Sequence, residues 1–191
     1  MGKNPLTALG DLFLSIEVTD REQKVINFVN AVSSVSKTIL KRAKQGNKII
    51  IIGNGGSASI ASHMATDFLK NIKIPALAFT DASLLTCLSN DLGYENVFSA
   101  PIGILADKGD VLFAISSSGK SKNILNAVSM ARKKGCFIAG LSGFSPDNPL
   151  REMGDINFYL PSSSYGDVEV THMAICHAVI DILYKEQEKR G

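Results

Sequence analysis

The chain contains the same local pattern twice: an apolar run leads directly into a loop rich in glycine and serine, and a helical stretch follows. The first copy is KIIIIGNGGSASIASHM, beginning at Lys48, and the second is DVLFAISSSGKSKNILNAV, beginning at Asp110. A strand that passes through such a loop into a helix is typical of parallel α/β proteins. The loop gathers backbone N–H groups at the positive end of a helix, so both copies predict a phosphate-binding edge.

Apolar runs bounded by turn residues alternate with helical stretches along the whole chain. Short apolar strands separated by helices pair in parallel through right-handed crossovers, which predicts a three-layer α/β/α sandwich with about five parallel strands. Asp20 is the expected N-cap of a long N-terminal helix, and Gly46 is its expected stop. Strands are predicted at 49–52, 76–79, 111–115, 137–141 and 156–160, and helices at 6–16, 20–45, 57–69, 82–89, 122–133 and 168–188.

Length and composition narrow the class of protein. The 191 residues predict a single domain, 1–191, with an N-terminal helical segment at 1–46 and the α/β core with the C-terminal helix at 47–191. The net charge of +2 comes without a dense basic stripe, so nucleic acid is not an expected ligand. No apolar run reaches ~18 residues, so no membrane segment is expected. Three cysteines in apolar surroundings predict reduced, buried thiols and a cytoplasmic location.

The first loop, GNGGS, follows its predicted strand without a spacer. Glycines such as Gly55 and Gly56 let the backbone turn tightly and approach a ligand closely. Asn54 and Ser57 add side chains that can donate or accept hydrogen bonds at the same place. A tight strand-to-helix turn that binds nothing is the plainer alternative for this loop when it is considered alone.

The second loop, SSSGKSKN, offers several hydroxyl groups around one flexible glycine, which suits the equivalent oxygens of a phosphate. A dinucleotide fold, with Asp81 as the ribose acid, is a rival interpretation of the first loop, but it has no need of this second one. No nucleotide is therefore expected, and the alternative of an ordinary solvated turn is weakened by the pairing of the two loops. The serines in question are Ser116, Ser117, Ser118 and Ser121.

The chain has only three histidines, and all of them lie near carboxylates. His63 and Asp67 are one turn apart on the helix that the first loop opens, so they can share a proton or hold a metal ion. On the last helix, Glu169 and His177 are about 80° apart and can face one cleft, whereas His172 is about 140° from His177 and faces elsewhere. A solvated surface pair and a buried structural histidine are the alternatives.

The last helix includes MAICHAVIDIL, which is apolar on nearly every side. A helix of that kind must be covered all round. Together with the long N-terminal helix it predicts packing between subunits, and hence a homo-oligomer.

Five segments together resemble the sugar isomerase (SIS) domain family, and within it the phosphoheptose isomerase family. They are spread over nearly the whole chain in the order that the family shows. The segments are GNGGS at 53, FTDASLLTCLSNDLGYENVFS at 79, ISSSGKSKNILNA at 115, GLSG at 140 and EVTHMAICHAVIDIL at 169.

The resemblance implies a parallel SIS core, a homotetramer, and the reversible isomerisation of sedoheptulose 7-phosphate to D-glycero-D-manno-heptose 7-phosphate. The family's catalytic carboxylate falls on Asp67 and its catalytic histidine on His177. By the same matching, Ser116, Ser118 and Ser121 hold phosphate, with Ser117 beside them. Asp91 binds sugar hydroxyls, and Asn54 and Ser57 line the substrate. Some members bind zinc through four positions that correspond here to His63, Asp67, Glu169 and His177.

Two of those positions depart from the family pattern, which typically has glutamate at residue 67 and glutamine at residue 169. Asp67 is one methylene shorter, which withdraws the proposed base, while two histidines with two carboxylates favour a divalent ion. A ligated His177 cannot also shuttle protons through the same nitrogen, so the metal scheme and the proton scheme compete. A non-catalytic SIS module of the replication-initiator-associating type and an isomerase of another sugar phosphate are the alternative functions.

Overall fold

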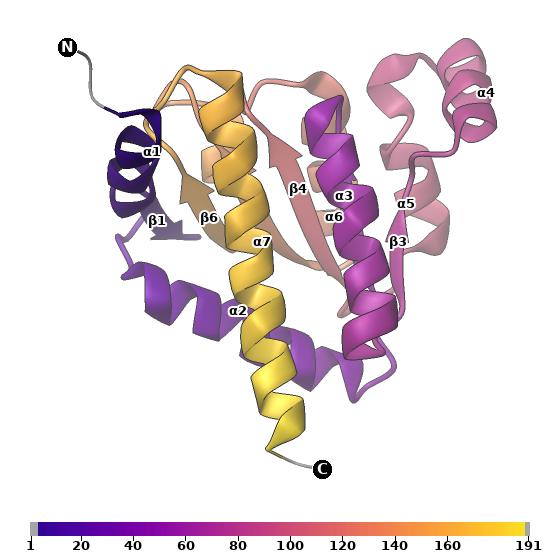
Figure 1. The fold of residues 1–191 in the computed structure, drawn as a ribbon. Helices are drawn as coiled ribbons and strands as arrows, with labels where there is room; N and C mark the ends of the chain where they lie inside the picture. Colours follow the sequence, from indigo (N-terminus) through magenta and orange to yellow (C-terminus); the bar gives the residue numbers. More distant parts are fainter. Residues whose placement is uncertain (1–3, 190–191) are drawn as a thin grey trace.

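The computed structural model describes residues 4–189 (Figure 1). The elements follow the alternation that the sequence predicts, with strands and helices taking turns from residue 49 onward. The strands are β1 (Glu17–Asp20), β2 (Ile49–Gly53), β3 (Ala76–Ala78), β4 (Val111–Ser116), β5 (Phe137–Ser142) and β6 (Ile156–Tyr159). The α-helices are α1 (Pro5–Leu14), α2 (Phe28–Ala43), α3 (Gly56–Asp67), α4 (Ala82–Leu92), α5 (Ser99–Leu105), α6 (Lys122–Lys133) and α7 (Tyr165–Glu188).

The strands form one sheet in the order β1-β6-β5-β4-β2-β3. The five strands that the sequence predicts are parallel, and their bounds agree with the prediction to within a residue or two. The sixth strand, β1, is an antiparallel edge that pairs with β6 from Glu17 opposite Tyr159. It was not expected, because four residues reading EVTD carry too little apolar pattern to be recognised as a strand.

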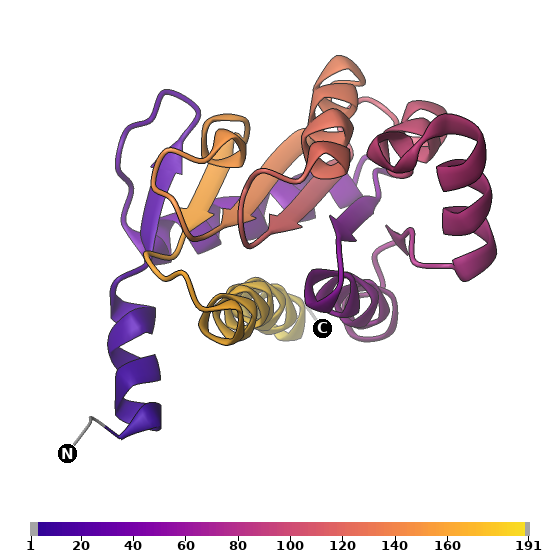
Figure 2. The same cartoon turned by 90° about the horizontal axis from the view of Figure 1, so that it is seen from above.

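Both faces of the sheet are covered, as the apolar strands require. In β2 the side chains alternate: Ile49 and Ile51 join one core cluster, and Ile50 and Ile52 join the other, each being 1% exposed. Helices α2, α3 and α7 cover the first face and α5 and α6 cover the second, while α4 lies beside the β3 edge and packs its leucines against the second core cluster (Figures 1 and 2). The predicted three-layer sandwich is therefore confirmed.

The expectation of one N-terminal helix from Asp20 was wrong. Asp20 ends β1, and its carboxylate accepts hydrogen bonds from the backbone N–H groups of Glu22 and Lys24 in a turn. The helix begins only after Asn27, whose side chain accepts from Val29 N–H and caps it. An aspartate can satisfy N–H groups in a turn as well as at a helix start, so the sequence pattern did not distinguish the two.

The expectation of buried thiols holds for two of the three cysteines. Burial raises the pKa of Cys136 to about 11 and that of Cys176 to about 12, which keeps both as unreactive thiols. Cys87 is exposed on α4, contrary to the expectation. Leucines at 84, 85 and 88 form the face of that helix that packs against the core. Cys87 lies outside this face, so it is exposed although its neighbours in the sequence are apolar.

The long helix α7 lies across the same face as α2 and α3 and carries most of its burial on one side. Val168, Ile175, Val179 and Leu183 are buried against the sheet and α2, while Tyr184 on the outer side is 48% exposed. Within residues 4–189, none of the helices combines the length and the apolar character that a membrane crossing requires.

His172 is the most deeply buried titratable group on α7. Its imidazole Nε2 lies 3.2 Å from the carbonyl oxygen of Ser142 at the end of β5, and its Nδ1 has no hydrogen-bond partner within residues 4–189. Burial lowers the pKa of His172 to about 4. This ring packs α7 onto the sheet and is not part of the group formed by His63 and His177; the helical phase predicted its separation from His177.

The buried imidazole makes stability depend on pH in one direction. Between about pH 6.5 and pH 4 the unfolded chain binds a proton at His172 that the folded chain does not, so stability falls as the pH is lowered through this window. The full effect is about 3 kcal/mol. Urea unfolding of the wild type and of His172→Gln at pH 7 and pH 4.5 measures it, and an equal loss of stability in both proteins would contradict the assignment.

Candidate active site

The first glycine loop joins β2 to α3 in a conformation that depends on its glycines. Gly55 has φ +53°, in the region that favours glycine, and serves as the N-cap of α3. A Cβ on Gly53 would lie 2.5 Å from the carbonyl oxygen of Ser57, so only a glycine lets the helix begin this close to the strand. The turn places Asn54 and Ser57 at the carboxyl edge of the sheet.

The serine loop after β4 meets the first loop at that edge and encloses a small polar cavity of about 120 Å³. The Oγ of Ser116 donates to the Oγ of Ser121 at 3.3 Å. Ser121 is also the N-cap of α6, yet its hydroxyl makes no capping bond, so it can still donate its proton to a ligand while it accepts from Ser116. The lining residues are Asn54, Ser57, Ile115, Ser116, Ser117, Ser118, Ser121, Tyr165 and Glu169.

Glu169 reaches this cavity from the first turns of α7. Its carboxylate lies so close to Gly56 that any side chain at residue 56 would overlap it. The contact joins the starts of α3 and α7, which run side by side across one face of the sheet (Figures 1 and 2). A carboxylate here can accept hydrogen bonds from the hydroxyl groups of a bound ligand.

Further along the same two helices, three side chains meet. The Oδ2 atom of Asp67 lies 3.5 Å from Nε2 of His63 and 3.9 Å from Nδ1 of His177. The two imidazole rings are 5.4 Å apart between centroids. One ligand atom from each of the three residues lies within 4.8 Å of the others, so the group could hold a metal ion.

A widened turn follows directly after Asp67. Residues Phe68–Ile72 form a π-helix, and within it Asn71 donates a hydrogen bond to Oδ1 of Asp67 at 3.1 Å. One carboxylate oxygen is thus held by an amide, while the other faces the two histidines. Single π turns occur often at functional sites. No sequence pattern predicts one here, so the contact of Asn71 with Asp67 was not expected.

The structure separates the four residues that the resemblance groups as metal ligands. His63, Asp67 and His177 come together, whereas Glu169 lies at the serine cavity, two helical turns from His177. His177 is half-exposed, unlike the buried alternative considered for it. Asp81, the ribose acid of the dinucleotide interpretation, instead caps α4 by accepting from Leu84 N–H.

Two further placements differ from what sequence reasoning emphasised. Asp91 is exposed near the end of α4, where it accepts from its neighbour Asn90, and it is not among the residues that line the serine cavity. Tyr165, which had no assigned role, does line the cavity at the start of α7. A tyrosine in the first turn of a helix carries no pattern of its own that indicates a ligand.

Comparison with known proteins agrees with this architecture. The sequence profile of the SIS domain matches residues 18–143. Phosphoheptose isomerase from Helicobacter hepaticus is 37% identical over 175 residues, covering 88% of this chain and 89% of that protein. The corresponding protein from Aliarcobacter butzleri is 39% identical over 157 residues, covering 79% and 82%. The solved phosphoheptose isomerase from Neisseria gonorrhoeae superposes with a TM-score of 0.76 at 31% identity, covering 82% and 87%.

These matches extend over both loops and the sheet between them. The chain belongs to the SIS domain family and, within it, to the phosphoheptose isomerases.

Because the hydroxyl of Ser121 makes no capping hydrogen bond to α6, its removal should affect ligand binding rather than the fold. Ser121→Ala should weaken the binding of inorganic phosphate about fivefold, the size expected for one hydrogen bond. Calorimetric titration measures this affinity. Ser129→Ala, on the exposed side of α6, is the matched control and should bind phosphate as the wild type does. Equal affinities in the two variants would remove Ser121 from the site.

Proposed function

We propose that this single SIS domain, residues 1–191, interconverts sedoheptulose 7-phosphate and D-glycero-D-manno-heptose 7-phosphate. Family membership supports the reaction class, and the serine cavity supplies the hydroxyl and N–H donors that a phosphate needs. The cluster of Asp67, His63 and His177 supplies groups that transfer protons. A non-catalytic binding module is not favoured, because the long matches are to named isomerases and the cluster is intact.

The observation that carries the proposal is the distance between the cavity and the cluster. Glu169 marks the cavity and His177 the cluster, and eight residues of α7 separate them, which is about 12 Å along the helix axis. An extended seven-carbon chain with a terminal phosphate is similar in length to this separation, whereas a three-carbon chain with a phosphate is much shorter. This similarity in length supports a heptose phosphate, bound by its phosphate in the serine cavity, as the substrate whose carbonyl end lies near the cluster.

In the proposed reaction, Asp67 removes the proton from the carbon next to the carbonyl through Oδ2. Its Oδ1 is held by Asn71, which fixes the plane of the carboxylate. His177 gives a proton to the carbonyl oxygen, which forms the cis-enediol. His177 then takes the proton of the neighbouring hydroxyl while Asp67 returns its proton to the former carbonyl carbon, which gives the product. Each positioned acid or base contributes typically 10²–10⁴-fold.

The same three side chains also suit a divalent ion, and we propose zinc as the alternative to the proton scheme, because Asp67 and His177 cannot bind an ion and transfer protons through the same atoms. Two imidazole nitrogens and one carboxylate oxygen make up a common catalytic zinc set with an open position, and their mutual separation of at most 4.8 Å requires only small rotations. Bound there, the ion would polarise the oxygen atoms of the substrate. Asn71 would then hold the second oxygen of a metal-bound carboxylate, a common outer-shell role.

The decisive assay is conversion of sedoheptulose 7-phosphate to the aldose phosphate, followed by NMR. The purified protein should catalyse it, and Asp67→Asn should lower kcat at least about 100-fold in either scheme. Chelation should abolish turnover until zinc is restored if the metal scheme operates, and should leave turnover unchanged if His177 shuttles the proton. Asp181→Asn, on α7 beyond the cluster, is the matched control and should leave kcat unchanged.

Each of the three results tests a different part of the proposal. No conversion by the wild type, with or without zinc, contradicts the proposed reaction. Full turnover after complete metal removal excludes the metal scheme and leaves His177 as the proton shuttle. An Asp67→Asn protein as fast as the wild type removes Asp67 from its role as the base.

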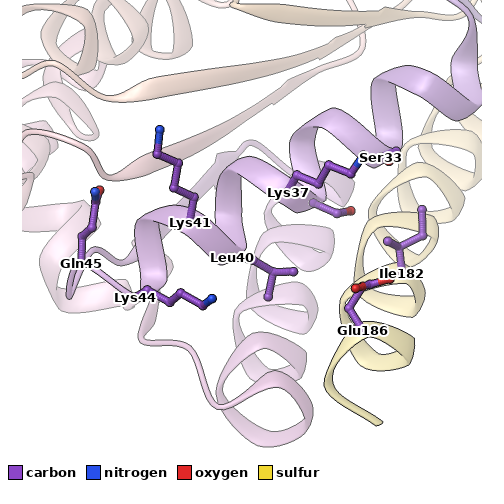
Figure 3. A pocket seen from close by; sticks show the side chains of 9 residues that line it. Ser33, Lys37, Leu40, Lys41, Lys44, Gln45, Ile182 and Glu186 are labelled. Carbon is purple, nitrogen blue, oxygen red and sulfur yellow. The ribbon is translucent and has the colours of Figure 1, made fainter. Parts of the chain in front are cut away.

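We also propose that the protein is a homotetramer and acts in the cytoplasm. Its cysteines are unpaired, which fits a reducing compartment. Helix α1 exposes Leu6 and Leu14, which are 78% and 89% exposed. Between α2 and α7 lies an open groove of about 540 Å³, with Leu40 and Ile182 facing one another across it (Figure 3). The exposed leucines of α1, and the two apolar side chains in a groove otherwise lined by polar and charged residues, support their burial by further copies of the chain.

Sedimentation measures this directly. The protein should sediment as a tetramer at micromolar concentration, and Leu40→Glu should shift it toward smaller species because the groove would then bury a charge. A stable monomer at that concentration would contradict the proposal.

A further inference from the structure

Three side chains beside the serine cavity form a closed hydrogen-bond network. Asn54 and Asn123 pair through both amides, with Asn54 Nδ2 to Asn123 Oδ1 at 3.0 Å and Asn123 Nδ2 to Asn54 Oδ1 at 2.9 Å. The hydroxyl of Tyr94 donates to the same Asn54 Oδ1 at 2.8 Å. Of the three, only Asn54 lines the cavity. Asn123 is buried in the first turn of α6, and Tyr94 begins a short 3₁₀ helix, Tyr94–Asn96, after α4.

A backbone group determines which way round the amides lie. The N–H of Ile124 donates to a side-chain atom of Asn123 at 3.0 Å, and since a backbone N–H can only donate, that atom is the oxygen. The Asn54 atom that faces this oxygen must then be its NH₂ group. The remaining two atoms pair the other way, NH₂ of Asn123 to oxygen of Asn54.

The hydrogen-bonding capacity of Asn54 can now be counted. Its carbonyl oxygen has two lone pairs, and both are taken, by Asn123 Nδ2 and by the hydroxyl of Tyr94. Its NH₂ group has two protons, of which one goes to Asn123; the other has no acceptor in the described part of the chain. Asn54 therefore offers the cavity an N–H and no lone pair.

We propose that Tyr94 and Asn123 are positioning residues that commit Asn54 to donate a hydrogen bond to an oxygen of the substrate. The inference rests on the proposed function and deepens it, because it assigns the polarity of one substrate contact. An amide free to rotate could serve a donor or an acceptor equally. With its oxygen saturated, Asn54 selects ligands that present an acceptor oxygen, such as a phosphate ester or a sugar carbonyl, and rejects ligands that present only donors.

Tyr94→Phe tests the inference with the loss of a single oxygen atom. Without the hydroxyl, the Asn54 oxygen regains a free lone pair and the amide loses one of its restraints. We expect kcat/KM for sedoheptulose 7-phosphate to fall about fivefold, mainly through KM, because the contact holds substrate and transition state alike. Tyr184→Phe, on the exposed side of α7, is the matched control and should behave as the wild type. A Tyr94→Phe protein with wild-type kcat/KM overturns the inference.

A double-mutant cycle separates positioning from a general structural effect. In an Asn54→Ala background, Tyr94→Phe should cost nothing further, because Tyr94 acts through Asn54. The isosteric Asn54→Asp, which accepts but cannot donate, should be at least as poor as Asn54→Ala, whereas a site that needed an acceptor would tolerate it. An undiminished loss in the Asn54→Ala background, or near-normal activity of Asn54→Asp, overturns the assignment.

Binding measurements keep this test independent of turnover. The apparent Kd of sedoheptulose 7-phosphate, measured by calorimetry on the same variants, should follow the same pattern as kcat/KM. Binding by a wild type that shows no conversion would contradict the proposed reaction and still test Asn54. Unchanged binding and turnover in Tyr94→Phe, with an active wild type, would contradict only the inference.

Discussion

The site depends on the close, parallel packing of α3 and α7 on one face of the sheet. Two contacts define it: the carboxylate of Glu169 against the backbone of Gly56, and Asp67 between the two histidines further along. Both helices start at the carboxyl edge of the sheet, α3 after β2 and α7 after β6, so they run in the same direction. Glycine at residue 56 leaves room for the Glu169 carboxylate in its present position, because a Cβ there would overlap it and displace it.

The resemblance predicts a glutamate at residue 67, and the shorter Asp67 of this chain still lies beside both histidines. Asp67 Oδ2 still lies within 3.9 Å of both histidines, and the π turn after it places Asn71 where it can hold the other oxygen. The cost of a shorter side chain is mainly one of reach and orientation. Here the orientation comes from the amide of Asn71, and the reach comes from the nearness of α7.

The chemistry that the structure supports is divided between two places on those helices. Hydroxyls and N–H groups gather at the loops, where helix starts favour an anion, and the titratable groups gather about two turns further along. A long phosphorylated substrate can be anchored at one place and react at the other. The arrangement also explains why Glu169, eight residues before His177, lies with the loops and not with the histidines.

The amino-acid sequence by itself determined the parallel sheet, the two glycine- and serine-containing loops and the His63–Asp67 pair, because these depend on local patterns: apolar runs, glycines in tight turns, and one-turn spacing on a helix. Tertiary structure alone decided the rest. It made Glu17–Asp20 an edge strand and exposed Cys87, and it buried His172 while leaving His177 open to the site. It also placed Asn71 on Asp67, and Tyr94 with Asn123 on Asn54. The reason is physical: a contact between side chains distant in the chain depends on how helices pack and rotate, and no local pattern records that.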